Sequence, residues 1–285
     1  MIENLLSNQN LFLIILGFVW ILGAVLQDLR RREVDNIWNF SLIFFALAYR
    51  AGFSIYNNDY WFLLNGIIGF VIFLILGNLF YYLRVFAGGD AKLMIALGPL
   101  LPLSYNWIVN FKIFGLFILL FLITGSVYVL VWSIILMIKN WKKFKKQYVR
   151  YFNNYLKMFF IAFLFFILWI IIGVFFKSSF FVIFGIVVML FPVLFVFAKS
   201  VEESCMIKSL DPKKVTEGDW LYHDVLIRGK SIKADWDGVS KRELFLMRKR
   251  MNKKILIKEG IPFTPGFLFG FIVLLYLFWK FGWWF

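Results

Sequence analysis

Long apolar runs are the feature that most limits what this chain can fold into. The clearest run covers residues 61–83, and three others of similar character cover 113–138, 158–176 and 179–198. A helix needs about 20 apolar residues to cross the hydrocarbon core of a bilayer. Hydrophobic residues make up 62% of the 285 residues, and one soluble core cannot bury that much apolar surface. The chain is therefore an integral membrane protein.

Four further apolar runs extend this pattern, at residues 11–26, 37–48, 91–109 and 263–279. The runs at 37–48 and 91–109 are marginal in length, so these segments could be tilted, broken or packed inside a bundle. We expect an all-α integral membrane protein with about eight transmembrane helices, within a range of six to eight. Residues 1–198 would form the transmembrane core, and residues 263–285 would form the last transmembrane helix.

The positions of the basic residues predict the orientation. The formal net charge of +15 could indicate binding to nucleic acid, but Lys and Arg stand at the ends of apolar runs, so no nucleic-acid partner is expected. If the loop after the first run faces the cytoplasm and the spans alternate, 27 of the 31 basic residues are cytoplasmic. The other four are Arg50, Lys112, Lys177 and Lys280. The positive-inside rule therefore favours eight spans in the plasma membrane, with both termini outside.

Residues 199–262 form the one polar stretch long enough for a small domain, and we expect it to be a cytoplasmic α+β domain. Ser240 and Glu243 have the spacing of a helix capping box. A basic amphipathic helix is expected from Lys241 to about Lys254, and its basic side chains could contact anionic membrane lipids. Its apolar face would carry Leu244, Met247 and Met251. Residues 219–232 favour short strands and turns.

Two aspartates stand at membrane borders and are the strongest candidates for catalysis. Asp28 ends the first span and Asp90 opens the fourth, so both would lie near the cytoplasmic leaflet. Ionisable groups at such positions are costly and are candidates for function, although either aspartate alone could simply cap a helix end facing water. Two neighbouring carboxyl groups bind protons with different affinities, so one can act as a base and the other as an acid.

Two glycines precede the second aspartate, in the segment from Ala87 to Asp90. Gly88 and Gly89 would let a peptide backbone come close, and they allow backbone angles that other residues avoid. Hydrolysis by paired aspartates needs neither a metal nor a cofactor, and none is expected. The sequence contains one histidine and one cysteine, which leaves few metal ligands apart from carboxylates.

These motifs resemble those of the type IV prepilin peptidase family of GxGD membrane aspartic proteases, in particular its archaeal preflagellin peptidase branch. The resemblance rests on Asp28 with the basic loop to Asp35–Asn36, and on Ala-Gly-Gly-Asp-Ala-Lys-Leu at 87–93. Glu-Gly-Ile-Pro-Phe-Thr-Pro at 259–265 is also similar to the beginning of the family's last span. The first glycine of GxGD is Ala87 here, and the cysteine motifs of the bacterial members are missing.

The resemblance implies an aspartic endopeptidase with Asp28 and Asp90 as catalytic residues. Its substrates would be prepilin-like or preflagellin precursors, cleaved between a basic leader and an apolar helix at the cytoplasmic border. N-methyltransferase activity is not expected. Gly88 and Gly89 would admit the substrate, Asn36 would hold the loop of the active site, and Lys92 would act mainly as an anchor at the membrane border.

Two other classes of protein fit part of the pattern. A transporter or channel could use the two aspartates for ions or protons, but the runs at 61–83, 113–138, 158–176 and 179–198 contain no acidic residue. A non-catalytic membrane protein of a surface-filament assembly is disfavoured only by the pair of aspartates. The sequence does not distinguish which class of pilin would be the substrate.

Overall fold

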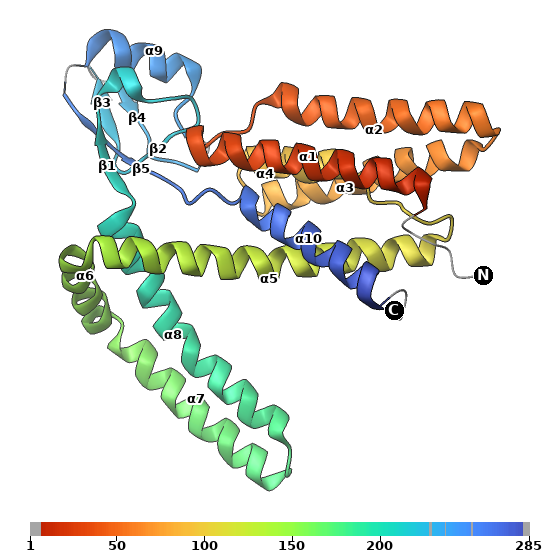
Figure 1. The fold of residues 1–285 in the computed structure, drawn as a ribbon. Coiled ribbons are helices and arrows are strands. Elements are labelled where there is room, and N and C mark those ends of the chain that lie inside the picture. Colours follow the sequence, from red (N-terminus) through yellow and green to blue (C-terminus); the bar gives the residue numbers. More distant parts are fainter. Residues whose placement is uncertain (1–6, 228–229, 237, 252, 282–285) are drawn as a thin grey trace. The chain divides into compact units, whose positions relative to one another are not determined.

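The computed structural model describes residues 7–281, apart from 228–229, 237 and 252, and Figure 1 shows its elements. Ten α-helices and five short strands are found among these residues. The chain divides into two compact units. One unit contains the chain up to Leu130 and again from Ile261, and the other contains Val131–Gly260.

All the regular secondary structure in the described part of the first unit is helical. Its helices are α1 (Asn8–Arg31), α2 (Asn36–Asn57), α3 (Tyr60–Tyr82), α4 (Gly88–Leu97), the first part of α5 (Trp107–Lys139), and α10 (Thr264–Phe281). Within this unit α1 packs against α10, α2 and α4, and α4 packs between α2 and α3. The core is built mainly from Leu and Phe side chains of these helices.

The second unit combines a helical part with a small mixed domain. The helical part contains the end of α5, α6 (Trp141–Asn154), α7 (Leu156–Phe175) and α8 (Ser179–Cys205). The domain contains β1 (Ile207–Leu210), a 3₁₀ turn (Pro212–Lys214), β2 (Trp220–Leu221), β3 (Val225–Ile227), β4 (Lys230–Ile232), α9 (Lys241–Arg250) and β5 (Ile255–Lys258). β5 pairs antiparallel with β1 and β2, while β3 and β4 form a hairpin.

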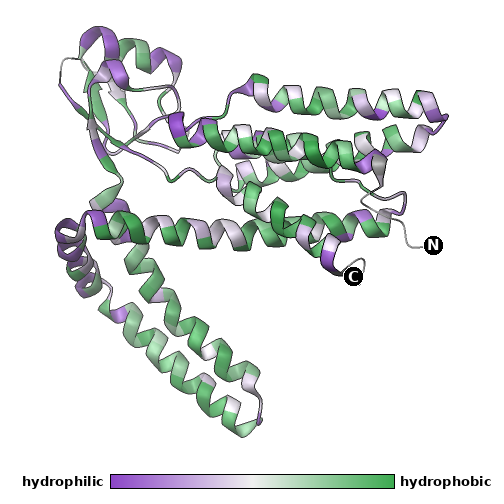
Figure 2. Cartoon of the chain, viewed as in Figure 1, coloured by the Kyte–Doolittle hydropathy of each residue, from purple (hydrophilic) through white to green (hydrophobic). Residues whose placement is uncertain are grey.

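The predicted membrane class is confirmed. Among the described residues, five helices are long and apolar enough to cross a bilayer: α1, α3, α5, α7 and α8. α10 is apolar but shorter. Figure 2 shows α7 and α8 coloured as hydrophobic over most of their length, in contrast to the hydrophilic α6 beside them. The chain is therefore a multi-pass, mainly helical membrane protein with a small region of strands, while the number of eight spans stays a prediction.

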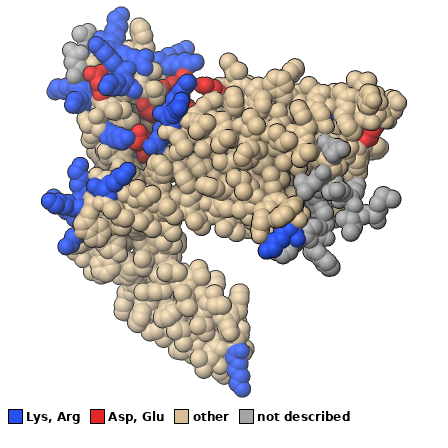
Figure 3. Space-filling model, in the orientation of Figure 1, with Lys and Arg blue, Asp and Glu red and all other residues tan. Residues whose placement is uncertain are grey.

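The basic connector between two apolar runs is itself a helix, α6. It places aromatic side chains against α8, where Phe144 contacts Phe197 and Tyr155 contacts Phe195. Its lysines lie on the exposed side. In Figure 3 the blue surface of Lys and Arg gathers over α6 and the small mixed domain, both parts of the second unit.

The small domain follows the predicted pattern closely. Ser240 N–H donates to Glu243 Oε2 at 2.9 Å, which forms the predicted capping box at the start of α9. Met247 is fully buried in the small core, with Leu244 and Met251 packed beside it. The helix ends at Arg250, before the expected Lys254, because the following residues extend into β5.

The second apolar run is part of a helix longer than the run itself. α2 continues from Asn36 to Asn57, past Arg50, although a charged residue normally ends an apolar span. Arg50 is fully buried, and its guanidinium donates to the backbone carbonyls of Phe62, Pro99, Leu100 and Pro102. These hydrogen bonds give the buried guanidinium its partners inside the protein, so α2 can continue past Arg50 to Asn57.

The fourth apolar run is broken. α4 has ten residues, about 15 Å of helix, which is half the thickness of the hydrocarbon core. Residues 98–106 then continue without regular helix. Just before α4, Phe86 contacts Phe263, whose neighbour Thr264 donates to Asp28 at the carboxyl end of α1, while Leu103 accepts a hydrogen bond from Asn10 at the amino end of α1. The segment therefore runs the length of α1, half as helix and half as irregular chain.

Buried side chains satisfy the backbone of this irregular chain. Irregular backbone is tolerated at membrane depth only where protein or a polar cavity supplies the missing hydrogen bonds. Arg50 supplies three such bonds from α2. Ser104 O accepts from Asn65 and Asn110, and Ser104 N–H donates to Asn110. This polar network fixes the path of the segment that begins at α4.

Glycines on α3 allow α4 to approach closely. A Cβ atom at Gly77 would lie 2.6 Å from Ile95 Cγ1 and 2.9 Å from Ala91 O. A Cβ at Gly98 would lie 2.8 Å from Gly69 O. Small residues let the backbones of membrane helices pack against each other in this way. The close contact holds the beginning of α4 at a defined place in the first unit.

Candidate active site

Asp28 lies in the last turn of α1 and is almost completely buried, with 7% of its surface exposed. Its Oδ2 accepts two hydrogen bonds from Thr264, one from the backbone N–H at 3.2 Å and one from the hydroxyl at 2.9 Å. Thr264 is the first residue of α10 and is itself buried. The carboxylate of Asp28 therefore lies at the amino-terminal end of α10.

Asp90 is the third residue of α4, and Ala87 occupies the N-cap position. An acidic residue in this third position can accept a hydrogen bond from the backbone N–H of the N-cap residue. The side chain is half-buried. Sixty-two positions separate Asp90 from Asp28 in sequence, but Phe86, four positions before Asp90, contacts Phe263, which directly precedes the Thr264 that donates to Asp28.

An aromatic cluster holds these two parts of the site together. Phe86, just before the Ala-Gly-Gly-Asp segment, and Phe263, just before Thr264, have ring centroids 6.3 Å apart. Phe86 is also 5.5 Å from Phe121 and 6.1 Å from Phe267. The start of α4 and the start of α10 are therefore anchored in one cluster, and each carries a group of the site.

The loop between α1 and α2 is held from both sides. Arg32 ends α1 with φ 62°, and its N–H donates to Asp28 O. Gln27 Oε1 accepts from the backbone N–H of Asp35 at 2.9 Å. The Asp35 side chain lies 3.6 Å from Arg31 in an exposed ion pair, and it makes no capping bond to α2. The chain therefore turns sharply beside the buried aspartate.

Asn36 and Lys92 are brought together as well. Asn36 is the first residue of α2 and Lys92 is the fifth residue of α4. Lys92 Nζ donates to Asn36 Oδ1 at 2.8 Å, and both side chains are exposed. This bond connects the end of the α1–α2 loop to the helix that carries Asp90.

The two glycines adopt ordinary helical geometry. We had expected them to allow backbone angles that other residues avoid, but both lie in α4, and neither is among the described residues with positive φ. A Cβ atom at Gly88 would only reach normal contact with Tyr81 at 3.9 Å, and one at Gly89 would meet nothing within 4 Å. The absence of side chains at these two positions leaves open space next to Asp90. The packing of the described residues would allow a larger residue than glycine at either position.

The sequence analysis did not identify three polar residues of this region: Thr264, Gln27 and Asn39. Thr264 lies in the Ile-Pro-Phe-Thr-Pro segment, whose resemblance was the signal that could have identified it. Gln27 could have been suspected only from its place next to Asp28. Asn39 is buried near Lys92, and it resembled an ordinary polar residue at the start of a span.

The arrangement offers paired carboxyl groups at the ends of helices, with open space beside one of them. Such a pair can move protons to and from a bound water and a peptide bond. Among the residues that the structure describes, no three His, Cys, Asp or Glu side chains gather in a way that could hold a metal ion.

Comparisons with known proteins agree with the two motifs. Residues 15–139 match the model of the type IV leader peptidase family. This region is less than half of the chain, and it contains both aspartates and the Asn36–Lys92 pair. The predicted resemblance to this family is therefore confirmed for the amino-terminal part of the chain.

Three curated proteins each match part of the chain. A preflagellin peptidase of Methanocaldococcus jannaschii is 35% identical over 92 residues, and one of Methanococcus maripaludis is 36% identical over 130 residues. These matches cover 32% and 38% of this chain. A preflagellin peptidase of Methanococcus voltae is 28% identical over 87 residues, 30% of this chain. The chain spans only 38%, 54% and 37% of the length of these three relatives.

Proposed function

We propose that this chain is a membrane aspartic endopeptidase that removes the basic N-terminal leader from prepilin-like or preflagellin precursors. The observation that supports this proposal is that Asp28 and Asp90 stand on two helices that pack together, α1 and α4, within the region that resembles leader peptidases. The names of the three relatives support the class of substrate. We propose no N-methyltransferase activity.

The paired carboxyl groups perform hydrolysis by moving protons. One carboxylate removes a proton from water as the water oxygen attacks the carbonyl carbon of the scissile peptide bond. The other carboxyl group donates its proton to the carbonyl oxygen. When the tetrahedral intermediate collapses, the carbon–nitrogen bond breaks, the amine leaves with the proton taken from water, and the second carboxylate takes back a proton from the hydroxyl that becomes the new carbonyl oxygen. Asp28 and Asp90 supply both groups.

The surrounding residues orient this pair. Thr264 fixes one oxygen of Asp28 through two hydrogen bonds, so that carboxylate points in one direction. The space beside Gly88 and Gly89 would admit the backbone of the substrate next to Asp90. Asn36 and Lys92 would hold the α1–α2 loop against α4, which keeps the two halves of the site at a constant distance.

The proposed orientation places the site at the cytoplasmic border of the plasma membrane. The distribution of basic residues supports a cytoplasmic location for residues 199–262. A site at this border receives water directly, because the scissile bond lies between a basic leader outside the hydrocarbon and an apolar helix within it. The precursor and the surrounding lipids would be the partners of the chain.

Transport of ions or protons is the weaker candidate. The first unit does contain buried polar side chains, including Asn65 in the run at 61–83. Arg50, Asn10, Asn65 and Asn110 donate to backbone carbonyls of the irregular chain after α4. Their role in fixing that chain accounts for their burial, so they need no role in a conduction path.

A cleavage assay tests the proposed function. The purified full chain in detergent would be incubated with a precursor that has a short basic leader and an apolar helix. We expect cleavage by the wild-type chain, and none by Asp28→Asn or Asp90→Asn variants that still insert and fold. Near-normal turnover by either variant would exclude the pair as the catalytic groups. No cleavage by the folded wild-type chain would reject the function.

A further inference from the structure

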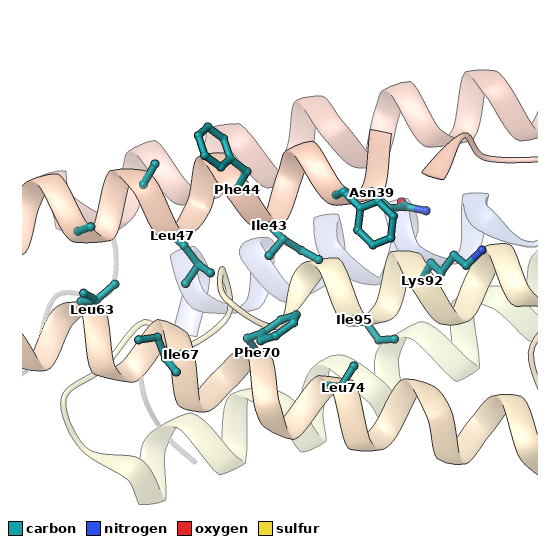
Figure 4. Close-up of a pocket in the computed structure, with 13 residues that line it drawn as sticks. Asn39, Ile43, Phe44, Leu47, Leu63, Ile67, Phe70, Leu74, Lys92 and Ile95 are labelled. Atoms are coloured by element: carbon teal, nitrogen blue, oxygen red, sulfur yellow. The ribbon is translucent and has the colours of Figure 1, made fainter. Parts of the chain in front are cut away.

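A groove runs between α2 and α3, with α4 as its floor. Its volume is about 660 Å³. Figure 4 shows Ile43, Leu47 and Phe70 between the helices, with Asn39 and Lys92 together at one end and Leu63 at the other. The α2 residues along it extend from Asn39 to Ala51, which corresponds to about 18 Å of helix.

The lining is apolar except at one end. Along the groove, α2 contributes Ile43, Phe44 and Leu47, and α3 contributes side chains such as Ile67 and Phe70. The polar end is formed by Asn39 and Lys92, and Lys92 lies two positions after Asp90. The groove therefore ends at the helix that carries a candidate catalytic group.

Asn39 is the unusual residue of this groove. Only 1% of its surface is exposed. Among the residues that the structure describes, neither Oδ1 nor Nδ2 of Asn39 has a hydrogen-bond partner. Other buried asparagines of the unit, such as Asn65 and Asn110, each donate to a backbone carbonyl. A buried amide with no partner is costly, so its presence calls for an explanation such as a bound group that completes it.

The segment of a peptide where an apolar helix begins has backbone groups that can pair with the Asn39 amide. The first N–H groups of a helix have no partner within the helix, and the extended residues before it have both N–H and C=O groups unpaired. A carboxamide can accept from one such N–H and donate to one such C=O. A lipid acyl chain fits an apolar groove equally well, but its ester carbonyl can only accept a hydrogen bond, so it would leave Asn39 Oδ1 without a donor.

We infer that the α2–α3 groove binds the apolar helix of the precursor, and that Asn39 binds the precursor backbone where that helix begins. This inference rests on the proposed function and adds to it the place where the substrate lies. The helix would lie along Phe44 and Leu47 towards Leu63. The residues before it would pass Asn39 towards Asp90, which brings the bond between leader and helix to the paired carboxyl groups.

The first experiment replaces Asn39 by leucine in the full chain, with cleavage and thermal unfolding measured on the same preparations. We expect kcat/KM for the precursor to fall at least tenfold, while the unfolding midpoint stays equal to that of the wild type or rises. The matched control is Asn65→Leu, which removes an amide that donates to Ser104 O and should lower the midpoint. An unchanged kcat/KM, or a midpoint as low as that of Asn65→Leu, would overturn the role of Asn39.

The second experiment measures binding without cleavage. A precursor with one cysteine on its apolar helix would be oxidised together with Phe44→Cys in a chain that also carries Cys205→Ser and Asp90→Asn. The matched control is Ile75→Cys, since Ile75 is a similarly exposed residue of α3 that does not line the groove. We expect disulfide formation at Phe44→Cys to exceed that at Ile75→Cys at least tenfold. Equal disulfide yields at the two positions would overturn the assignment of the groove to the apolar helix of the precursor.

The two experiments distinguish a failure of the groove assignment from a failure of the proposed function. If the wild-type chain cleaves the precursor but Phe44→Cys and Ile75→Cys react equally, the groove assignment fails and the peptidase remains. If the wild-type chain does not cleave, the proposed function fails, and the disulfide yields alone decide whether the groove binds an apolar helix.

Discussion

Thr264 donates two hydrogen bonds to a single oxygen of the Asp28 carboxylate, through its backbone N–H at 3.2 Å and its hydroxyl at 2.9 Å. The two residues are 236 positions apart, at the end of α1 and the start of α10. One of the candidate catalytic groups is therefore oriented by the last helix of the chain.

Thr264 provides the first prediction. Thr264→Val keeps the size of the side chain and removes only the hydroxyl bond to Asp28. A hydrogen bond to a charged group contributes about 1.5–3 kcal/mol, so kcat should fall about 10- to 100-fold if the reacting geometry depends on it. Thr264→Ser should retain most of the activity. The measurement is kcat and KM over a range of pH values, and equal kcat for the valine and wild-type chains would contradict a positioning role.

The space beside Gly89 provides the second prediction. A Cβ atom there would meet nothing within 4 Å, so Gly89→Ala should leave stability unchanged or raise it by about 0.5–1 kcal/mol. We expect cleavage to weaken in Gly89→Ala and to be lost in Gly89→Val, because the side chain fills space that the substrate backbone needs. Gly52→Ala in α2 is the matched control, since a Cβ at Gly52 also meets nothing. Full activity of Gly89→Val would argue against substrate binding at this place.

Arg50 provides the third prediction, on stability. Arg50→Leu would leave four buried carbonyl groups without their donor. Each unpaired group costs about 1–3 kcal/mol, so the loss should reach about 3 kcal/mol or more. Arg50→Lys should also destabilise, because one ammonium cannot reproduce the spread of the guanidinium. Thermal unfolding in detergent measures the effect. Lys112→Leu, at an exposed position of α5, is the control, and equal midpoints for the two leucine variants would be inconsistent with this account.

The orientation provides the fourth prediction. Single cysteines at exposed positions, Asn58→Cys in the α2–α3 turn and Lys214→Cys in the small domain, would be placed in a chain carrying Cys205→Ser. In intact cells, a membrane-impermeant maleimide should label Asn58→Cys and not Lys214→Cys until the cells are opened. The reverse pattern would overturn the proposed topology.

Local sequence patterns predicted a large part of this structure. Hydropathy identified the membrane class, because a long apolar run has few other places in which to bury its surface. The capping box at Ser240 and the apolar face with Met247 depend on residues within one or two turns of each other, so they could be derived from spacing alone. The two aspartates were visible because an ionisable group at a membrane border is costly and is therefore a candidate for function.

Long-range packing explains where those patterns fell short. The predicted run at 37–48 stops before Arg50, whereas α2 continues past this residue. Nothing in the sequence shows that backbone carbonyls of the chain after α4 surround the guanidinium of Arg50. The run at 91–109 read as one apolar stretch, yet its backbone leaves the helix after Leu97 and is satisfied by Asn10, Arg50 and Asn110. Hydropathy measures which residues avoid water, and it does not specify which backbone groups find partners.

The sequence by itself determined that this chain lies in a membrane, that most of it is helical, and that Asp28 and Asp90 stand at helix ends. These properties depend on the transfer of side chains from water and on residues a few positions apart. Only the tertiary structure decided that Thr264 donates to Asp28, and that the buried side chain of Asn39 has no hydrogen-bond partner in the described part of the chain. Such contacts join segments that are distant in sequence, and their geometry comes from how whole helices pack against each other.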